Sequence, residues 1–285
     1  MMIAITALFL VTACFCRSDR ETVKAPAAEP KNIAVATPTP LPSLPGSGEK
    51  RADNGDFLVE KSTAGTSRFR EIDDRVRAEK LLEKAADQLN RSLSLPHDIP
   101  LRTKECGEQN AFYDPKDRSV TICYELMDRF HQTFRLSGMP EEQANEKMFH
   151  AIRFVFLHEV GHALIDAYNV PITGNEEDAA DRLSAFVNLR ELGEDGVQAV
   201  LAAADAFAIE SKQAKPAKKH LADEHLLQEQ RFYNSLCMIY GSDPAKHSDL
   251  VKENYLPRER ADRCQYEYRK NVDSWMRLLE PWRKN

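Results

Sequence analysis

The chain has 285 residues, and its 39 lysine and arginine residues against 45 aspartate and glutamate residues leave a formal net charge of −6. No basic cluster is strong enough to indicate nucleic-acid binding, because the four lysines between residues 212 and 219 are typical of a solvated loop. About 230 residues follow the N-terminal region, which is enough for one sizeable hydrophobic core.

The first 16 residues carry no charge and are mostly apolar. Their apolar run, residues 3–12, is too short to span a bilayer as a helix but suits the core of a signal peptide. The run ends in VTAC at Cys14, which resembles the lipobox of bacterial lipoproteins. The resemblance implies a signal peptide over residues 1–13, a lipid on Cys14, and export to the cell envelope with a membrane anchor. No lysine or arginine precedes the run, so a plain secretory signal or a misplaced start codon is the alternative.

Residues 17–55 are rich in proline, alanine, threonine, serine and glycine and hold few large apolar side chains. Such a segment cannot bury enough surface to offset its ordering entropy. We therefore expect a lipidated N-terminus and a disordered tether over residues 14–55, followed by one folded domain over residues 56–285.

Within the domain, apolar spacing and turn residues predict helices and two strands. A long amphipathic helix is expected over residues 68–95, ended by Pro96 and Pro100. Strands are expected over residues 101–106 and 119–123, with residues 110–113 on the approach to the turn between them. Further helices are then expected over residues 126–136, around 152–164, from 177 to 189, and over 194–212, 219–240 and 258–282.

Four cysteines lie in the domain, and in an exported protein they suggest two disulfides with three alternative pairings. We favour Cys106–Cys123 and Cys237–Cys264, because each pair brackets a turn-rich segment. A cysteine metal site is the alternative, but no close C-x-x-C spacing supports it.

The sequence HEVGH supplies His158, Glu159 and His162 within a stretch whose apolar residues recur at helical spacing. Histidines four residues apart share one face of a helix, so both imidazoles reach one metal ion. Glu159 follows the first histidine, and its carboxylate addresses a water on that metal rather than the metal itself. The alternative is two ordinary histidines on a core helix, since a five-residue pattern also arises by chance.

A second acidic motif follows in GNEEDAAD, where Glu177 and Asp181 are again four residues apart, after a break that contains a proline and a glycine. It resembles the E-x-x-x-D element of thermolysin-like zinc peptidases, the gluzincins. The resemblance implies that Glu177 is the third zinc ligand and that Asp181 accepts a hydrogen bond from His158. Two alternatives stay open: the acidic residues complement the helix dipole, or Glu176 is the ligand.

Two further resemblances concern the substrate. The sequence NAFY at residues 110–113 is similar to the edge strand of thermolysin-like peptidases, which implies that Asn110 and Ala111 bind the substrate backbone. An ordinary hairpin is the alternative. His225, followed six residues later by Arg231, is similar to an element of membrane-associated gluzincins, which implies a catalytic His225 near the developing oxyanion. The alternative for His225 is a surface or capped histidine.

Together, CGEQNAFYDP, HEVGH, GNEEDAAD and the last two cysteines resemble a bacterial family described as "putative metallopeptidase", over roughly residues 70–283. The resemblance implies an α+β fold, in which a mostly helical zincin-like domain carries a small antiparallel β-hairpin or edge-strand sheet beside the HExxH helix. It also implies a peptidase that binds one Zn²⁺ per chain through His158, His162 and Glu177. Glu159 would be its general base, and its partner would be a peptide or protein substrate.

Three other functions remain as alternatives to the peptidase. The first is a non-catalytic lipoprotein that binds zinc or a peptide. A purely structural site has no use for a base such as Glu159 and tends to have four protein ligands, which disfavours this alternative. The second is a hydrolase of the deformylase type with a cysteine as third ligand, and the third is a structural domain without metal.

Overall fold

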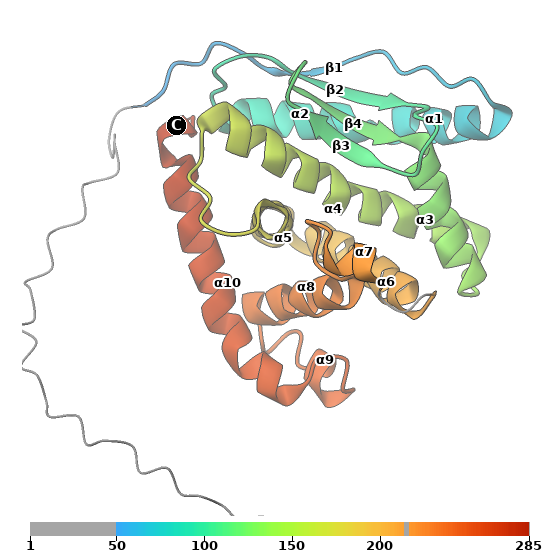
Figure 1. Cartoon of the computed structure of the whole chain (residues 1–285), viewed down its shortest axis with the longest axis vertical. Coiled ribbons are helices and arrows are strands. Elements are labelled where there is room, and N and C mark those ends of the chain that lie inside the picture. The colour runs from blue at the N-terminus through green and yellow to red at the C-terminus, as the bar shows by residue number, and fades with distance from the viewer. Residues whose placement is uncertain (1–49, 214–216, 285) are drawn as a thin grey trace, which may run out of the picture. The chain divides into compact units, whose positions relative to one another are not determined.

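The computed structural model describes residues 50–213 and 217–284, and most of this chain is helical (Figure 1). The expected signal peptide, the lipidation site Cys14 and the tether up to residue 49 lie outside these residues. In chain order the elements are β1 (Phe57–Val59), α1 (Ser67–Glu79), α2 (Leu81–Ser92), β2 (Ile99–Lys104), β3 (Ala111–Asp114), β4 (Ser119–Cys123), α3 (Tyr124–Leu136), α4 (Glu141–Tyr168), α5 (Glu176–Glu191), α6 (Gly193–Gln213), α7 (Lys218–Leu221), α8 (Gln228–Ser242), α9 (Asp249–Lys252), α10 (Arg258–Leu279) and the 3₁₀ helix η1 (Glu280–Trp282). The predicted α+β class is confirmed.

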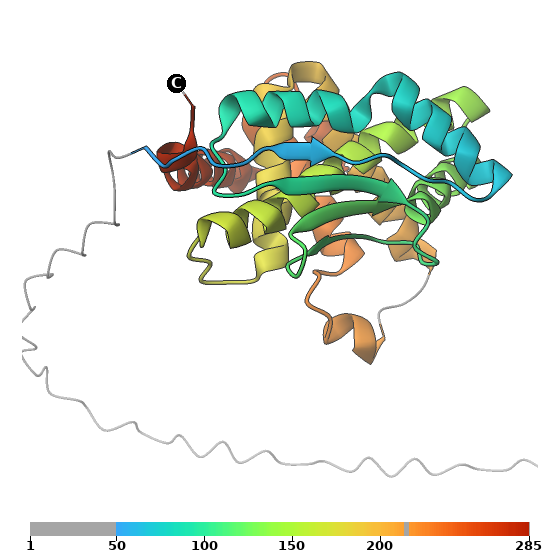
Figure 2. The same ribbon diagram turned by 90° about the horizontal axis from the view of Figure 1, so that it is seen from above.

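The four strands form one mixed sheet in the order β1–β2–β4–β3. Only β3 and β4 form an antiparallel hairpin, whereas β1 pairs with β2, and β2 with β4, in parallel. The expected antiparallel hairpin is therefore present as β3 and β4, and the two parallel pairings make the sheet as a whole a mixed one. After β2 the chain crosses to the far edge as β3 and returns between the two as β4, so the returning strand runs parallel to β2 (Figure 2).

The two edge strands of the sheet, β1 and β3, differ in how their outer backbone groups are paired. At β1, the side-chain amide of Asn90 on α2 accepts a hydrogen bond from Phe57 N at 2.8 Å and donates one to Phe57 O at 3.1 Å. This contact satisfies edge groups that would otherwise be a template for another extended chain. At the other edge no further strand of the described residues pairs with β3, which lies beside α4 (Figure 1).

Helix α4 occupies the centre of the domain, between the sheet and helices α5 and α6 (Figure 1). Most of its residues from Ala144 to Tyr168 are buried, as is typical of a helix that is apolar on every side. One hydrophobic core joins α4 to the sheet and to α1, α2 and α3, and a second core lies between α6, α8 and α10. The histidines of HEVGH are therefore carried by a central helix that is buried along most of its length.

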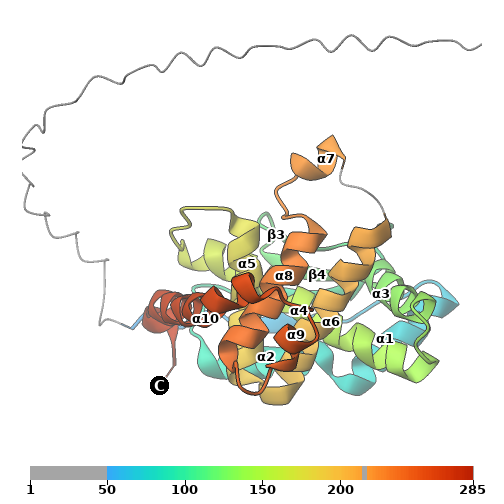
Figure 3. The same ribbon diagram turned by 90° about the horizontal axis from the view of Figure 1, so that it is seen from below.

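Two predicted helices are each broken in the structure. The helix expected over residues 68–95 is two helices, α1 and α2, because Lys80 adopts a left-handed conformation with φ 51° and its N–H caps α1. Lysine rarely adopts this conformation, so the sequence contains no signal for the break. The helix expected over residues 219–240 is the short α7 and then α8, and His225 lies in the non-helical segment between them (Figure 3).

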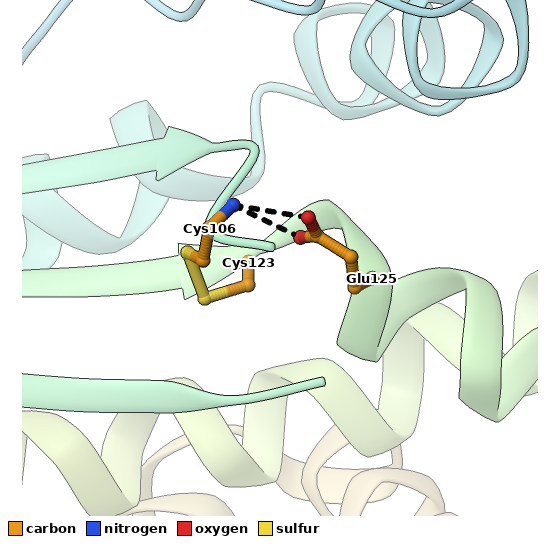
Figure 4. Close-up of side chains that lie close together, drawn as sticks. All are labelled: Cys106, Cys123 and Glu125. Atoms are coloured by element: carbon orange, nitrogen blue, oxygen red, sulfur yellow. Dashed lines mark hydrogen bonds between the residues drawn. A yellow bond between two sulfur atoms is a disulfide. The ribbon is translucent and has the colours of Figure 1, made fainter. Parts of the chain in front are cut away.

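Both predicted disulfides are present, with Cα–Cα distances of 5.6 Å for Cys106–Cys123 and 5.0 Å for Cys237–Cys264. The first follows from the topology: β2 and β4 are parallel, with Lys104 in register with Cys123, so Cys106 two residues beyond β2 reaches the end of β4. Glu125, in the first turn of α3, accepts the Cys106 N–H with both carboxylate oxygens at 3.1 Å (Figure 4). These three residues are close enough for a metal ion, but the two sulfurs are bonded to each other and are not thiolate ligands.

The folded part of the chain begins before the expected boundary at residue 56. Arg51 N donates to Pro281 O at 2.8 Å, Asn54 N donates to Leu95 O at 2.7 Å, and Asp53 forms an ion pair with Lys284. Residues 51–54 thus contact the C-terminal end of the domain and the loop between α2 and β2, instead of belonging to the tether. None of the helices in the described residues has the length and apolarity needed to cross a bilayer.

Candidate metal centre

Helices α4 and α5 carry the two sequence motifs and cross at Gly161. A Cβ atom on Gly161 would lie 3.1 Å from the Cα of Ala180, closer than side chains normally pack, so glycine permits this approach. Gly161 directly precedes His162, and Ala180 directly precedes Asp181, so the crossing sets the two motifs against each other. Asn175 begins α5 by accepting the N–H of Glu177 at 2.7 Å, which places Glu177 in the first turn.

We expect Gly161→Val to push α5 away from α4 and so to weaken metal binding, because Glu177 moves while the histidines stay. Overpacking of this kind costs about 1–3 kcal/mol of stability. Zinc titration of the purified chain, with thermal unfolding alongside, measures both effects. The control is Gly174→Val in the loop before α5, where a Cβ atom would meet nothing within 4 Å. Zinc affinity unchanged in Gly161→Val would contradict this role of the crossing.

The imidazoles of HEVGH and the carboxylate of α5 converge. His158 Nε2 lies 3.1 Å from His162 Nε2 and 3.1 Å from Glu177 Oε2, and His162 Nε2 lies 3.3 Å from Glu177 Oε1. Although burial opposes ionisation, the neighbouring imidazoles hold the pKa of Glu177 well below its ordinary value. The sequence-predicted ligand set of two histidines and one glutamate is thus brought together by the fold.

The Glu177 carboxylate also tests whether a metal ion fits this cluster. Its Oε2 atom is buried and makes no hydrogen bond of normal geometry with any described group, although Nε2 of His158 and of His225 lie 3.1 and 3.0 Å away. These nitrogen and oxygen atoms lie close together in a buried space, yet they do not form good hydrogen bonds with one another. A cation bound between them would satisfy all of them. Imidazole nitrogen and carboxylate oxygen are the donors that catalytic zinc sites use.

Each of three imidazoles is held at Nδ1 by a separate carboxylate at 2.8 Å. This contact leaves Nε2 as the atom that faces the cluster, which is the arrangement of metal-bound histidines. The pairs are His158 with Asp181, His162 with Glu176, and His225 with Asp223. The alternative in which Glu176 is a ligand is therefore disfavoured, because its carboxylate lies on the far side of the His162 ring.

The pKa values of the two HEVGH histidines follow from these carboxylates. Burial by itself would lower both values, but the hydrogen bond with Asp181 and the close Glu177 carboxylate raise the pKa of His158 to about 9. The close Glu177 carboxylate and the hydrogen bond with Glu176 raise the pKa of His162 to about 9 in the same way. The carboxylates around the two imidazoles therefore stabilise a positive charge in this cluster, such as that of a bound cation.

Arg231 of α8 contacts the carboxylate that holds His158. Its guanidinium donates to both carboxylate oxygens of Asp181, at 2.8 and 2.7 Å, and lies over the ring of Phe207 with 4.2 Å between its Cζ and the ring centroid. Burial alone would raise the pKa of Asp181, but the charges of Arg231 and His158 lower it well below its ordinary value. Arg231 therefore links α8 to the carboxylate that holds His158, and it also borders the cavity beside Glu159.

Glu159 is buried beside the histidines and borders a cavity of about 560 Å³. Burial raises its pKa above the ordinary value, although the charges of His158 and His162 oppose this shift. The cavity is also lined by Asn110 and Ala111, the residues expected to bind substrate.

The backbone of β3 presents hydrogen-bonding groups at its free edge. Cys123 N donates to Asn110 O at 3.1 Å, so Asn110 faces β4. Because backbone groups alternate along a strand, Ala111 and Tyr113 direct theirs to the opposite side. β3 packs beside α4, and its Ala111 lines the same cavity as Glu159, which places this edge against the centre. An extended chain in the cavity would find an unpaired strand edge next to Glu159.

Several residues of the centre were missed by sequence reasoning. Gly161 lies between the two histidines of HEVGH, and Asp223 precedes His225 by two residues. Their positions in or beside the motifs could therefore have identified both as candidates for the centre. The roles of Glu176 and Arg231 had no such signal, because each depends on a contact between separate elements.

A family model described as "Putative metallopeptidase" matches residues 62–279, and the chain belongs to this family. None of the curated proteins and none of the solved structures matches the chain. The family description indicates peptidase activity and a metal, and the described residues contain two overlapping groups suited to one, His158–Glu159–His162 and His158–Glu177–His225.

Proposed function

We propose that this member of the metallopeptidase family is a zinc-dependent peptidase of the gluzincin type. The observation that carries the proposal is the convergence of His158 Nε2, His162 Nε2 and the Glu177 carboxylate within 3.1 to 3.3 Å of one another. Glu159 and the free edge of β3 border the adjoining cavity. A metal-dependent hydrolytic centre needs a metal site, a base and a place for the substrate, and these features are candidates for all three.

When bound, a zinc ion would polarise the scissile carbonyl and lower the pKa of a nearby water. His158, His162 and Glu177 would hold it, with Asp181 and Glu176 fixing the two imidazoles through Nδ1. The substrate backbone would pair with the edge of β3 and thereby be oriented across the centre. Glu159 would take the proton of the attacking water and pass it to the nitrogen of the leaving amine. Its burial favours this role, because a raised pKa suits a group that must both accept and release a proton.

Two alternatives are weakened by particular residues. A deformylase-type centre needs a cysteine thiolate, but all four cysteines of the described chain are in disulfides. A non-catalytic binding protein would have no use for a buried carboxylate that borders both the histidines and a cavity.

The location that we propose is the cell envelope, with the chain exported and attached to the membrane through a lipid on Cys14. Two disulfides support the export, because they persist in oxidising compartments and are rare in the cytosol. Mass spectrometry of the protein extracted from membranes would detect the lipid, and a Cys14→Ser variant should release the domain into the soluble fraction. Cys14→Ser remaining in the membrane fraction would argue against the anchor.

Metal content tests the centre itself. We expect about one zinc per chain in the purified protein, lost in both His158→Ala and Glu177→Ala, because each removes one of three ligands. The measurement is elemental mass spectrometry after exposure to zinc. His97→Ala, which changes a half-buried histidine whose Nδ1 contacts Asp98 O in its own loop, should keep the metal. No zinc in the wild type would refute the proposal, and zinc retained in Glu177→Ala would remove Glu177 from the ligand set.

A further inference from the structure

The imidazole of His225 lies next to the proposed metal ligands His158 and Glu177. Its Nε2 lies 3.0 Å from Glu177 Oε2, and its ring is nearly parallel to that of His158, with 6.5 Å between ring centroids and 19° between planes. One nitrogen of His158, one nitrogen of His225 and one oxygen of Glu177 all lie within 4.8 Å of one another. A donor to an oxyanion would instead direct its N–H away from the Glu177 carboxylate, toward the substrate.

The outer contacts of His225 repeat those of the HEVGH histidines. Its Nδ1 is held by Asp223 Oδ1 at 2.8 Å, the distance found for His158 with Asp181 and for His162 with Glu176. Asp223 Oδ1 also accepts the backbone N–H of His225 at 3.0 Å, which fixes the turn that presents the ring. A carboxylate on Nδ1 orients an imidazole so that Nε2 can bind a metal.

The segment that carries His225 is attached to the helix that carries Glu177. Asn175, which begins α5, donates from its side-chain amide to Glu224 O at 2.6 Å while its side-chain oxygen accepts the N–H of Glu177. The residue before His225 is therefore tied to the residue that begins α5. Yet the side chain of His225 is 48% exposed, against 5% for His158 and 14% for His162.

The geometry points to His225 as a fourth protein ligand of the metal, one that closes the resting centre and leaves when a substrate enters. This inference rests on the proposed metal centre. Four protein ligands fill a tetrahedral zinc site, whereas catalysis needs one open position. His158, His162 and Glu177 come from packed helices and stay, while His225 comes from an exposed, non-helical segment and can move out.

Metal affinity and cobalt spectroscopy test the ligand role on the full chain. We expect His225→Ala to weaken Zn²⁺ binding on the order of 10- to 100-fold, with Asp223→Asn changing it in the same direction by less. Co²⁺ in place of Zn²⁺ should show a different visible absorption spectrum in His225→Gly than in the wild type, and added imidazole should restore it. His97→Ala and the circular dichroism of each metal-free variant control for folding.

The outcomes separate this inference from the proposed function. If His162→Ala loses zinc but His225→Ala binds it as the wild type does, with the same Co²⁺ spectrum, His225 is not a ligand and the three-ligand centre stands. If His162→Ala leaves zinc affinity unchanged, the proposed centre fails, and the inference fails with it.

Displacement of His225 is tested with a small metal-binding probe. Acetohydroxamate should bind the Co²⁺ form of His225→Ala more tightly than the Co²⁺ wild type, on the order of tenfold, because in the wild type it competes with the imidazole. Equal affinities for the two proteins, read from the same absorption bands, would overturn the displacement.

Discussion

Replacing Glu159 with glutamine is expected to lower peptide hydrolysis by about 100- to 10,000-fold while the metal stays bound. The amide has nearly the same shape as the carboxylate, so it should fit the buried position of Glu159 beside β3. It cannot accept a proton from water, however, and the base is lost. The measurement is digestion of a mixed peptide library by the zinc-loaded protein, with products quantified by mass spectrometry and metal content determined on the same sample.

Glu142→Gln is the matched control for this experiment. It makes the same chemical change on the same helix, at a carboxylate that is 84% exposed and pairs only loosely with Arg75, at 3.7 Å. Hydrolysis should therefore be unaffected. Cleavage at the wild-type rate by fully metallated Glu159→Gln would show that Glu159 is not the base and would favour a water activated by the metal alone.

Replacing Asp181 with alanine is expected to have the largest effect on folding, about 3–5 kcal/mol of stability. Asp181 makes two hydrogen bonds with the Arg231 guanidinium, and both side chains are largely buried, so the variant leaves a positive charge without its partner. Zinc affinity should also fall by about 10- to 100-fold, because His158 loses the carboxylate that orients its ring. Urea unfolding of the metal-free chain measures the first effect, and zinc titration measures the second.

Two further variants separate the ion pair from its role at the metal. Asp178→Ala removes a more exposed ion pair with Arg182 on the same helix and should cost less than about 1 kcal/mol. The double variant Asp181→Leu with Arg231→Met should recover much of the stability, because a buried ion pair can be replaced by apolar side chains, but it should not recover zinc affinity. A cost for Asp181→Ala no larger than that of Asp178→Ala would contradict the importance of the pair.

The local motifs of the centre could be predicted from the sequence because they depend only on helical geometry. His158 and His162, and likewise Glu177 and Asp181, are four residues apart and therefore share one helix face wherever the helix is placed. The cysteine pairs could be predicted for a similar reason, since each encloses a short turn-rich segment. The family resemblance that the motifs implied is also confirmed, over residues 62–279.

The arrangement of these motifs relative to one another was decided by tertiary packing. No local pattern specifies that α5 crosses α4 at Gly161, that Arg231 of α8 reaches Asp181, or that Glu176 turns to His162 instead of the shared centre. These contacts join residues 14 to 50 positions apart, and they follow from how the two hydrophobic cores fit the helices together.

The same distinction explains the errors in the predicted elements. Helical periodicity continues through Lys80 and through residues 222–227, so the sequence suggested a single helix in each region. The chain turns at Lys80 because α2 packs on β1, and it turns again at residues 222–227, where His225 lies beside Glu177. The parallel pairing of β2 with β4 was likewise hidden, since strand propensity is the same in either direction. The sequence by itself determined which side chains share a helix face, because that depends on a fixed 3.6-residue turn. Only the tertiary structure decided which faces meet, because that depends on burying apolar surface across the whole domain.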